Sequence, residues 1–168
     1  MRDSDLVAVN VRSSRYWIAR VSHRCLHCAG ATSAAALVLP PAHETSSFIE
    51  DPASSAEADR WEHAPRCAVL FHIGRLPAEV ARRLTAVAPG YRLAVGDGIR
   101  GRHWANHCER CDCLQEDDAL FCEPEGAFFP ISSAGARQIE LVEVVEEIEA
   151  FAAGYIFDPP FFEFAVRK

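Results

Sequence analysis

Two short cysteine motifs, HRCLHCAG at residues 23–30 and ANHCERCDC at residues 105–113, decide how the chain is interpreted. In each motif two cysteines lie three positions apart, so one tight turn can direct both thiolates toward a single metal ion. Two such turns together supply the four corners of a tetrahedron. The sequence therefore predicts one four-thiolate zinc site. Its predicted ligands are Cys25, Cys28, Cys108 and Cys111.

The two motifs are far apart in the chain, with residues 29–107 between them. This separation exceeds that of a small zinc ribbon, so a loop, a strand and a helix are expected as an insertion between the motifs. The entropy cost of closing a loop grows slowly with its length, whereas structural zinc binding gives apparent free energies of roughly 10–16 kcal/mol in zinc-finger peptides. A bound metal can therefore hold the ends of this insertion together.

With a β-like run entering each of them, the two motifs resemble those of the zinc-ribbon or rubredoxin-like group of four-cysteine knuckle proteins. The arrangement is similar to uncharacterised bacterial proteins with two separated CxxC knuckles. The resemblance covers only the two motifs directly, and it implies a zinc-binding fold without an activity. The sequence departs from the usual CxxCG pattern, because Gly30 comes one position late and Asp112 stands where the second glycine is expected.

Other ligands and another metal stay open at this site. Four thiolates accept iron as well as zinc, and zinc is favoured because no partner cofactor site for electron transfer is recognisable in the sequence. Cys113 lies two residues after Cys111 and competes as a ligand, although an extended CxC directs both side chains to one face. A histidine close to the motifs can also replace a cysteine. The histidines in question are His23, His27, His103 and His107.

The chain has 168 residues, of which 49% are apolar, and this size favours one zinc-binding domain over residues 1–168. Its N-terminus lacks the continuous apolar stretch of a signal peptide. The longest apolar run, residues 34–39, falls far short of the roughly 20 residues of a membrane helix. We therefore expect a soluble, cytoplasmic protein with no membrane partner. Of its seven cysteines, those in the paired CxxC motifs are expected to bind metal rather than to form disulfides.

Antiparallel strands are expected on either side of both motifs. Residues 16–21 lead into the first motif and residues 32–39 leave it. Residues 91–95 and 99–104 flank Gly96-Asp97-Gly98, and Asp-Gly between two β-like runs is a strong hairpin signal. Residues 6–11 are expected to form a strand that pairs with 16–21 as a hairpin, and residues 67–73 a buried central strand. A further strand is expected at residues 119–123, after the second motif. Residues 138–145 fit either a strand or a helix.

One helix and one long loop complete the expected fold. Apolar residues recur at helical spacing after Pro77, which predicts a helix over residues 77–88. Residues 42–65 are rich in Ser, Ala and acidic side chains without a sustained period, so a flexible, mobile loop is expected there. We therefore predict an α+β fold, in which an antiparallel β-sheet built around a zinc-ribbon-like four-cysteine site packs against the inserted helix.

A nucleic-acid partner is suggested by arginines and aromatic residues that alternate on the strands entering both motifs. Arginines can bind phosphates, and exposed rings can stack on bases. The candidate nucleic-acid-binding residues are Arg24, Arg100, Arg102, Trp104 and Arg110. In the alternative interpretation the tryptophans pack over the zinc site, and the arginines are solvated or pair with the acidic C-terminal third. The alternative is favoured, because the net charge of −7 repels nucleic acid at long range.

Motifs for catalysis are weak in this sequence. The glycines at residues 96–101 match GxGxxG, but the second cysteine motif follows instead of the helix that a dinucleotide site requires. His103 and His107 lie four residues apart without the glutamate of HExxH. The sequence therefore favours a non-enzymatic zinc-binding protein, a binding or adaptor domain with a protein or nucleic-acid partner. The remaining hypotheses are a nucleic-acid-binding zinc ribbon and a metal-dependent enzyme or rubredoxin-like redox protein.

Overall fold

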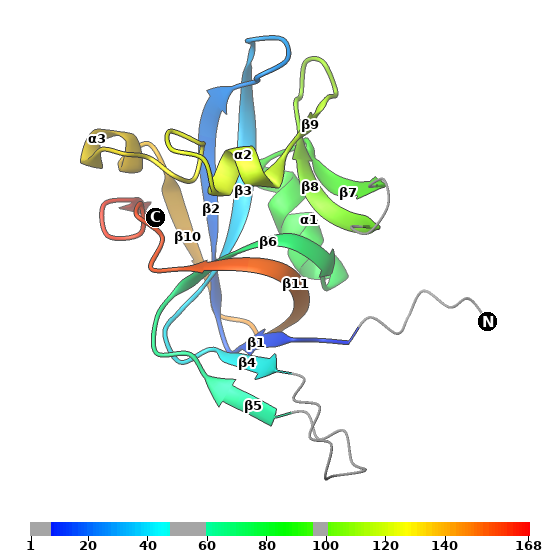
Figure 1. The fold of residues 1–168 in the computed structure, drawn as a ribbon, viewed down its shortest axis with the longest axis vertical. Helices are drawn as coiled ribbons and strands as arrows, with labels where there is room; N and C mark the ends of the chain where they lie inside the picture. The colour runs from blue at the N-terminus through cyan, green and yellow to red at the C-terminus, as the bar shows by residue number, and fades with distance from the viewer. Residues whose placement is uncertain (1–7, 48–59, 96–100) are drawn as a thin grey trace, which may run out of the picture.

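The computed structural model describes residues 8–47, 60–95 and 101–168, and strands dominate this part of the chain (Figure 1). The strands are β1 (Val11–Ser13), β2 (Tyr16–Arg24), β3 (Ala31–Leu39), β4 (Glu44–Ser47), β5 (Arg60–His63), β6 (Ala68–Arg75), β7 (Tyr91–Val95), β8 (Arg102–His107), β9 (Leu114–Gln115), β10 (Glu140–Val144), β11 (Ile148–Phe157) and β12 (Val166–Arg167). The helices are α1 (Ala78–Val87), α2 (Asp117–Phe121) and α3 (Ser133–Ala136). None of these helices is long and apolar enough to span a membrane.

The strands of the described chain form one curled, mixed sheet. Its main path runs β12-β10-β2-β3-β6-β11-β1-β4-β5, and β7, β8 and β9 branch from it through the pairing of β8 with β6. Strands β10 and β12 pair in parallel, and the other pairs are antiparallel. The predicted α+β fold, with an antiparallel sheet built around the four-cysteine site and one inserted helix, is therefore wrong. The protein is mostly β, and the cysteine motifs occupy the tips of two hairpins of a larger sheet.

Two apolar cores lie against this sheet, and β3 contributes to both. Leu37 and Leu39 pack in the core that includes α1, whereas Ala36 and Val38 pack in the core that includes α2 and α3. This division follows from the two-residue period of a strand, which directs successive side chains to opposite faces. Because both faces are covered, β3 is continuously apolar instead of alternating with polar residues.

Several local predictions are confirmed. The helix expected at residues 77–88 is present as α1, with Pro77 immediately before it. The strand expected at residues 67–73 is present as β6, which pairs with β3, β8 and β11. Strands β2 and β3 pair across the first motif, and β7 pairs with β8 around residues 96–100, which lie outside the described ranges. The ambiguous segment 138–145 contains strand β10.

The predicted hairpin between residues 6–11 and 16–21 is wrong. Strand β1 pairs with β11 and β4, while β2 pairs with β3 and β10. The side chain of Asn10 explains this choice, because its Nδ2 donates to Ala152 O at 2.8 Å and its Oδ1 accepts from Ala152 N at 2.9 Å. A contact between residues so distant in the chain leaves no local pattern in the sequence.

The long loop predicted at residues 42–65 is also wrong at both of its ends, which pair as strands β4 and β5. Arg12 explains why such polar segments are ordered. Its Nε lies 2.6 Å from Glu44 Oε2, and its guanidinium carbon lies 4.2 Å from the centre of the Trp61 ring. An ion pair and a cation–π contact therefore support strands that bury little apolar surface. Residues 48–59 lie outside the described ranges.

The strand predicted at residues 119–123 is wrong, because helix α2 ends within this segment. Leu120 and Phe121 are buried in the core, and a short apolar run of this kind fits a buried helical turn as well as a strand. Asp117 and Asp118 occupy the first turn, where negative charge favours a helix. The strand that leaves the second motif is instead the short β9.

Candidate metal centre

The two cysteine motifs occupy neighbouring hairpin tips at one end of the molecule (Figure 1). The first motif lies between β2 and β3, and the second lies between β8 and β9. Asn106 links the two hairpins, because its Oδ1 accepts from Ala35 N at 2.8 Å and its Nδ2 donates to Ala35 O at 3.0 Å. The Asn106 side chain is buried, and it replaces the backbone ladder that β3 and β8 do not form.

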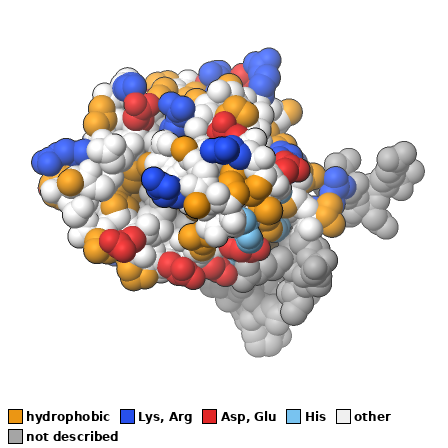
Figure 2. Space-filling view, turned by 90° about the horizontal axis from the view of Figure 1, so that it is seen from above, with side chains coloured by type: hydrophobic (Ala, Val, Ile, Leu, Met, Phe, Trp, Pro, Cys, Tyr) orange, Lys and Arg blue, Asp and Glu red, His pale blue; other side chains and the backbone are white. Residues whose placement is uncertain are grey.

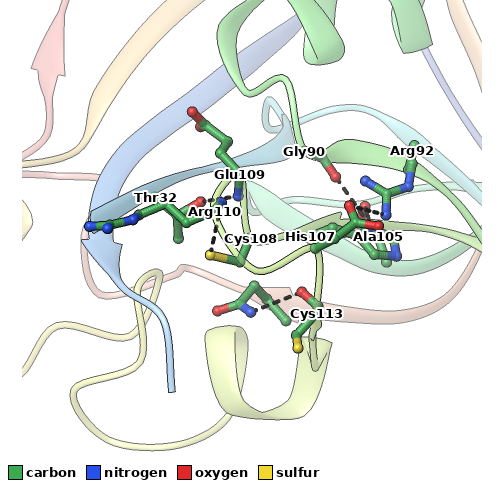
Figure 3. A network of polar contacts seen from close by, with 11 residues as sticks. Thr32, Gly90, Arg92, Ala105, His107, Cys108, Glu109, Arg110 and Cys113 are labelled. Atoms are coloured by element: carbon green, nitrogen blue, oxygen red, sulfur yellow. Dashed lines mark hydrogen bonds and ion pairs between the residues drawn. The ribbon is translucent and has the colours of Figure 1, made fainter. Parts of the chain in front are cut away.

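A second set of contacts joins the hairpins closer to the cysteines. The backbone N–H of Glu109 donates to Thr32 Oγ1 at 3.0 Å, a contact drawn beside Cys108 in Figure 3. The Glu109 carboxylate in turn accepts from Ser33 N at 3.0 Å. These contacts hold the second motif against the strand that leaves the first.

The four predicted ligands form a cluster close enough to bind one metal ion. Cys25 Sγ lies 3.7 Å from Cys111 Sγ, and Cys28 Sγ lies 3.7 Å from Cys108 Sγ. All four sulfur atoms lie within 4.8 Å of one another. In a tetrahedral site with Zn–S bonds of about 2.3 Å, the sulfur atoms are roughly 3.8 Å apart. Each short contact joins cysteines of different motifs, so the cluster depends on both hairpins.

The two motifs have equivalent backbones. In the first motif, Cys25 O accepts from Ala29 N and Cys25 N donates to Gly30 O. In the second motif, Cys108 O accepts from Asp112 N and Cys108 N donates to Cys113 O. All four N···O distances are 2.9 Å. The residue four positions after the first cysteine is left-handed, with φ of 57° at Ala29 and 63° at Asp112. Glycine adopts this conformation without steric cost. The departure from CxxCG is therefore a change of residue type and not of backbone geometry.

Hydrogen bonds to sulfur stabilise the thiolates of this cluster. His27 N donates to Cys25 Sγ at 3.3 Å, and Arg110 N donates to Cys108 Sγ at 3.4 Å, at equivalent positions of the two motifs. The buried side chain of Gln115 adds a third bond, from its Nε2 to Cys25 Sγ at 3.3 Å. Gln115 was not predicted from the sequence, and its place on the strand that leaves the second motif is the one signal that points to it.

The surroundings shift the pKa values of these thiols in opposite directions. Burial raises the pKa of Cys25, but two backbone N–H groups and the Gln115 amide outweigh it and lower this pKa to about 6. A hydrogen bond from the backbone of Cys111 lowers the pKa of Cys108. The backbone N–H of Cys113 lowers the pKa of Cys111, yet burial and the adjacent thiols raise it by more. Ionising all four thiols therefore calls for a cation among them.

Cys113 and His107 lie outside the four-sulfur cluster. The carbonyl of Cys113 closes the second motif, since it accepts from Cys108 N at 2.9 Å. His107 is buried, and its Nδ1 lies 3.2 Å from Gly90 O and 3.3 Å from Ala105 O (Figure 3). Burial lowers the pKa of His107. Both residues therefore support the second motif from its sides.

The other candidate histidines do not join the four-sulfur cluster either. His27 is exposed and His23 is half-buried. His103 belongs to a separate group with His72 and Asp117, in which the ligand atoms lie within 4.8 Å of one another. These three residues lie on three different elements, so no local sequence pattern connects them.

The candidate nucleic-acid-binding residues have different surroundings. Arg24, Arg102 and Arg110 are exposed, and Arg100 lies outside the described residues. Trp104 is half-buried and packs against the apolar core that includes α1. Its ring stacks on Tyr91, with centres 6.2 Å apart and 13° between the planes. Trp104 is therefore engaged inside the protein instead of facing a base.

Basic side chains at this end are interspersed with acidic and apolar ones, as the view onto the hairpin tips shows (Figure 2). Arg15 pairs with Glu143 at 3.2 Å and Arg20 pairs with Glu140 at 3.9 Å, so pairing with the acidic C-terminal third is confirmed for these two arginines. The idea that the tryptophans cover the cysteines is wrong. Trp17 packs on Phe162, with ring centres 5.1 Å apart, and Trp104 packs on Tyr91.

The chain matches no family model, no curated protein and no solved structure. Conclusions about its function therefore rest on the geometry and chemistry of its own residues.

Proposed function

We propose that the protein holds one structural zinc ion through Cys25, Cys28, Cys108 and Cys111 and serves as a non-enzymatic binding or adaptor domain. The observation that carries the proposal is the pair of 3.7 Å sulfur contacts that join the two motifs. Four protein thiolates complete a tetrahedron, whereas catalytic zinc sites keep one position open for water or substrate. A closed site of this kind favours a structural role. Its free thiols fit a reducing compartment such as the cytoplasm.

In this role the ion ties together hairpin tips that the chain brings from distant positions. Asn106 and Glu109 already align β8 with β3 through hydrogen bonds, so the cysteines need little rearrangement on metal binding. A site whose ligands are pre-positioned loses less conformational entropy when it closes. The metal is then expected to make the tips rigid rather than to build the sheet.

A rigid tip suits a contact with another protein. Leu26, at the tip of the first motif, is 80% exposed although it is a large apolar side chain. It borders a cavity of about 200 Å³, which also includes Leu120 and Ala127 in its lining. An exposed apolar side chain beside a partly apolar hollow supports a protein partner.

The metal assignment is tested by mass spectrometry of purified, untagged protein. The Cys25→Ser/Cys108→Ser variant removes one ligand from each motif, and Cys122→Ser is the matched control because Cys122 is exposed and lies outside the cluster. We expect the double variant to lose one equivalent of tightly held zinc relative to the wild type and to the control.

Two other outcomes would change the conclusion. Iron in place of zinc would favour a rubredoxin-like redox protein, since four thiolates also bind iron. An equal metal content in the wild type and the double variant would remove the four-cysteine site. Circular dichroism of each variant shows whether the sheet has formed, so that loss of metal is separated from loss of the fold.

A further inference from the structure

We infer that His72, His103 and Asp117 form a second metal site, for a divalent transition-metal ion such as zinc. They lie on β6, on β8 and at the first position of α2, respectively, and each offers one ligand atom within 4.8 Å of the other two. Asp117 is 4% exposed and His103 is 7% exposed. The site is independent of the four-cysteine centre and of the function proposed for it.

The Asp117 carboxylate is the charged member of this group. Its Oδ2 accepts from His72 N at 2.7 Å and lies 3.3 Å from His72 Nδ1. A buried carboxylate is costly unless a positive charge or several donors compensate it. In a tetrahedral site with zinc bonds of about 2.0–2.1 Å, neighbouring nitrogen and oxygen ligands are roughly 3.3–3.4 Å apart. The spacing of His72 Nδ1 and Asp117 Oδ2 therefore fits two ligands of one ion.

The ring of His72 is oriented by a second carboxylate. Its Nε2 lies 3.2 Å from Asp118 Oδ1, so a proton on Nε2 is donated to Asp118. Metal-bound histidines commonly donate their other ring N–H to a carboxylate in this way, which fixes the tautomer. His72 Nδ1 then directs a lone pair toward Asp117 Oδ2, so two acceptors face each other. A cation bound between them would remove this repulsion. The backbone of His72 is left-handed, with φ of 50°, a strained conformation for a residue other than glycine.

His103 supplies an independent observation. Its Nδ1 is buried and has no hydrogen-bond partner in the described part of the chain. The His103 ring lies with its centre 5.9 Å from that of His72. A buried polar atom without a partner calls for a bound ion or water, and a metal shared with the neighbouring ring satisfies it.

The donor set determines what this site can bind. Two imidazole nitrogens and one carboxylate oxygen suit zinc and neighbouring first-row divalent ions, without the thiolates that define the first site. Three protein ligands leave a coordination position for water or for an external ligand, as in zinc sites that are open. The two sites therefore differ in kind, since the four-cysteine site is closed.

The competing explanation is an ion pair without metal. A doubly protonated His72 can bridge Asp117 and Asp118, because its two ring nitrogens lie 3.3 and 3.2 Å from their carboxylates. This arrangement uses no metal and leaves His103 Nδ1 without a partner. Zinc stoichiometry and the protonation of the His72 ring separate the two explanations.

The stoichiometry is measured on the full chain after dialysis against a buffered concentration of free zinc. We expect Asp117→Asn and His103→Gln each to bind one equivalent fewer than the wild type, which binds two when the four-cysteine site is also filled. The control Asp158→Asn removes an exposed carboxylate outside both groups and is expected to keep two. Because Asp118 acts through His72, Asp118→Asn is expected to weaken binding of the second ion by about 10-fold to 100-fold.

A measurement on the wild type covers the case in which the variants do not fold. In a zinc titration followed by nitrogen NMR, the second equivalent is expected to shift the ring nitrogens of His72 and His103 together. The proposal is overturned if no added equivalent of zinc shifts the ring nitrogens of His72 and His103. It is equally overturned if Asp117→Asn and His103→Gln both retain the second ion.

Discussion

Ala29 holds the turn of the first motif in a backbone conformation that is unfavourable for its side chain, with φ of 57°. The left-handed region costs a residue with a Cβ roughly 1–2 kcal/mol, whereas glycine in place of alanine costs about 0.5–1 kcal/mol of chain entropy. Ala29 is exposed, so no packing is lost. We therefore expect Ala29→Gly to raise the free energy of unfolding by up to about 1 kcal/mol, seen as a Tm about 2–4 °C higher in thermal unfolding.

Ala31→Gly is the matched control, because Ala31 is an exposed alanine in strand β3. There the substitution is expected to lower stability by about 0.5–1 kcal/mol, since glycine weakens a strand. A decrease of the same size in both variants would contradict the role given to the left-handed turn. Asp112, at the equivalent position, is a poorer test because glycine there also removes its 2.7 Å ion pair with Arg92.

At the level of single residues, the sequence predicted that the four cysteines lie close together, but it did not predict the residues that contact and position them. Each CxxC spacing is a local pattern, and the two motifs have a common geometry, so proximity of the four cysteines followed without knowledge of the sheet. Gln115 donates to a sulfur of the other motif, and Asn106 bonds to a distant strand. A single glutamine or asparagine has many possible partners, so neither contact could be read from its own neighbourhood.

Among the elements, β8 itself contacts β3 through the side chain of Asn106, while the contacts of Glu109 with β3 come from the motif that follows β8. Replacing Asn106 with alanine leaves the buried N–H and C=O of Ala35 without these partners, at a cost of about 1–3 kcal/mol for each group. We therefore expect Asn106→Ala to lower the free energy of unfolding by about 2–5 kcal/mol in chemical denaturation. It is also expected to weaken zinc binding in competition with a chelator, because β8 leads directly into the second motif.

Asn10→Ala is a close control for this prediction. Asn10 makes the same two-bond contact with the backbone of Ala152, but it joins β1 to β11 instead of the two hairpins of the metal centre. A comparable loss of stability with unchanged zinc affinity is expected. If both variants weakened zinc binding equally, the effect of Asn106 would be one of general stability and not of alignment.

Elements with a local pattern were predicted, and elements that depend on distant partners were not. Helix α1 and the β2–β3 and β7–β8 hairpins have periodicity or turn residues of their own. Strands β4 and β5 depend on Arg12, which lies on another strand and contacts Glu44 and Trp61. Composition alone therefore made this polar segment look like a loop.

At the scale of the whole molecule, the sequence did not predict β11, a strand of 10 residues, and this omission led to the wrong fold class. It pairs with β6 on one side and β1 on the other, so the order of the sheet depends on it. Its sequence combines an acidic start with small and aromatic residues and does not show a clean two-residue period. Without this strand, the remaining pattern favoured a small sheet around the cysteines instead of a large sheet that carries them at its edge.

The large sheet has a consequence for metal removal. Strands β6 and β11 lie away from the hairpin tips (Figure 1), and most residues of the tips are exposed, including residues 26–29, 109 and 110. After chelation we therefore expect amide hydrogen exchange to accelerate at Ala29 and Asp112, whose N–H groups bond to cysteine carbonyls, while the amides of β6 and β11 keep their protection. Added zinc should restore the slow exchange. The exposed cysteine outside the four-cysteine cluster is replaced as Cys122→Ser, to prevent its oxidation from imitating the effect. A loss of protection throughout the sheet would instead mean that the metal is required for the fold as a whole, as in small zinc fingers.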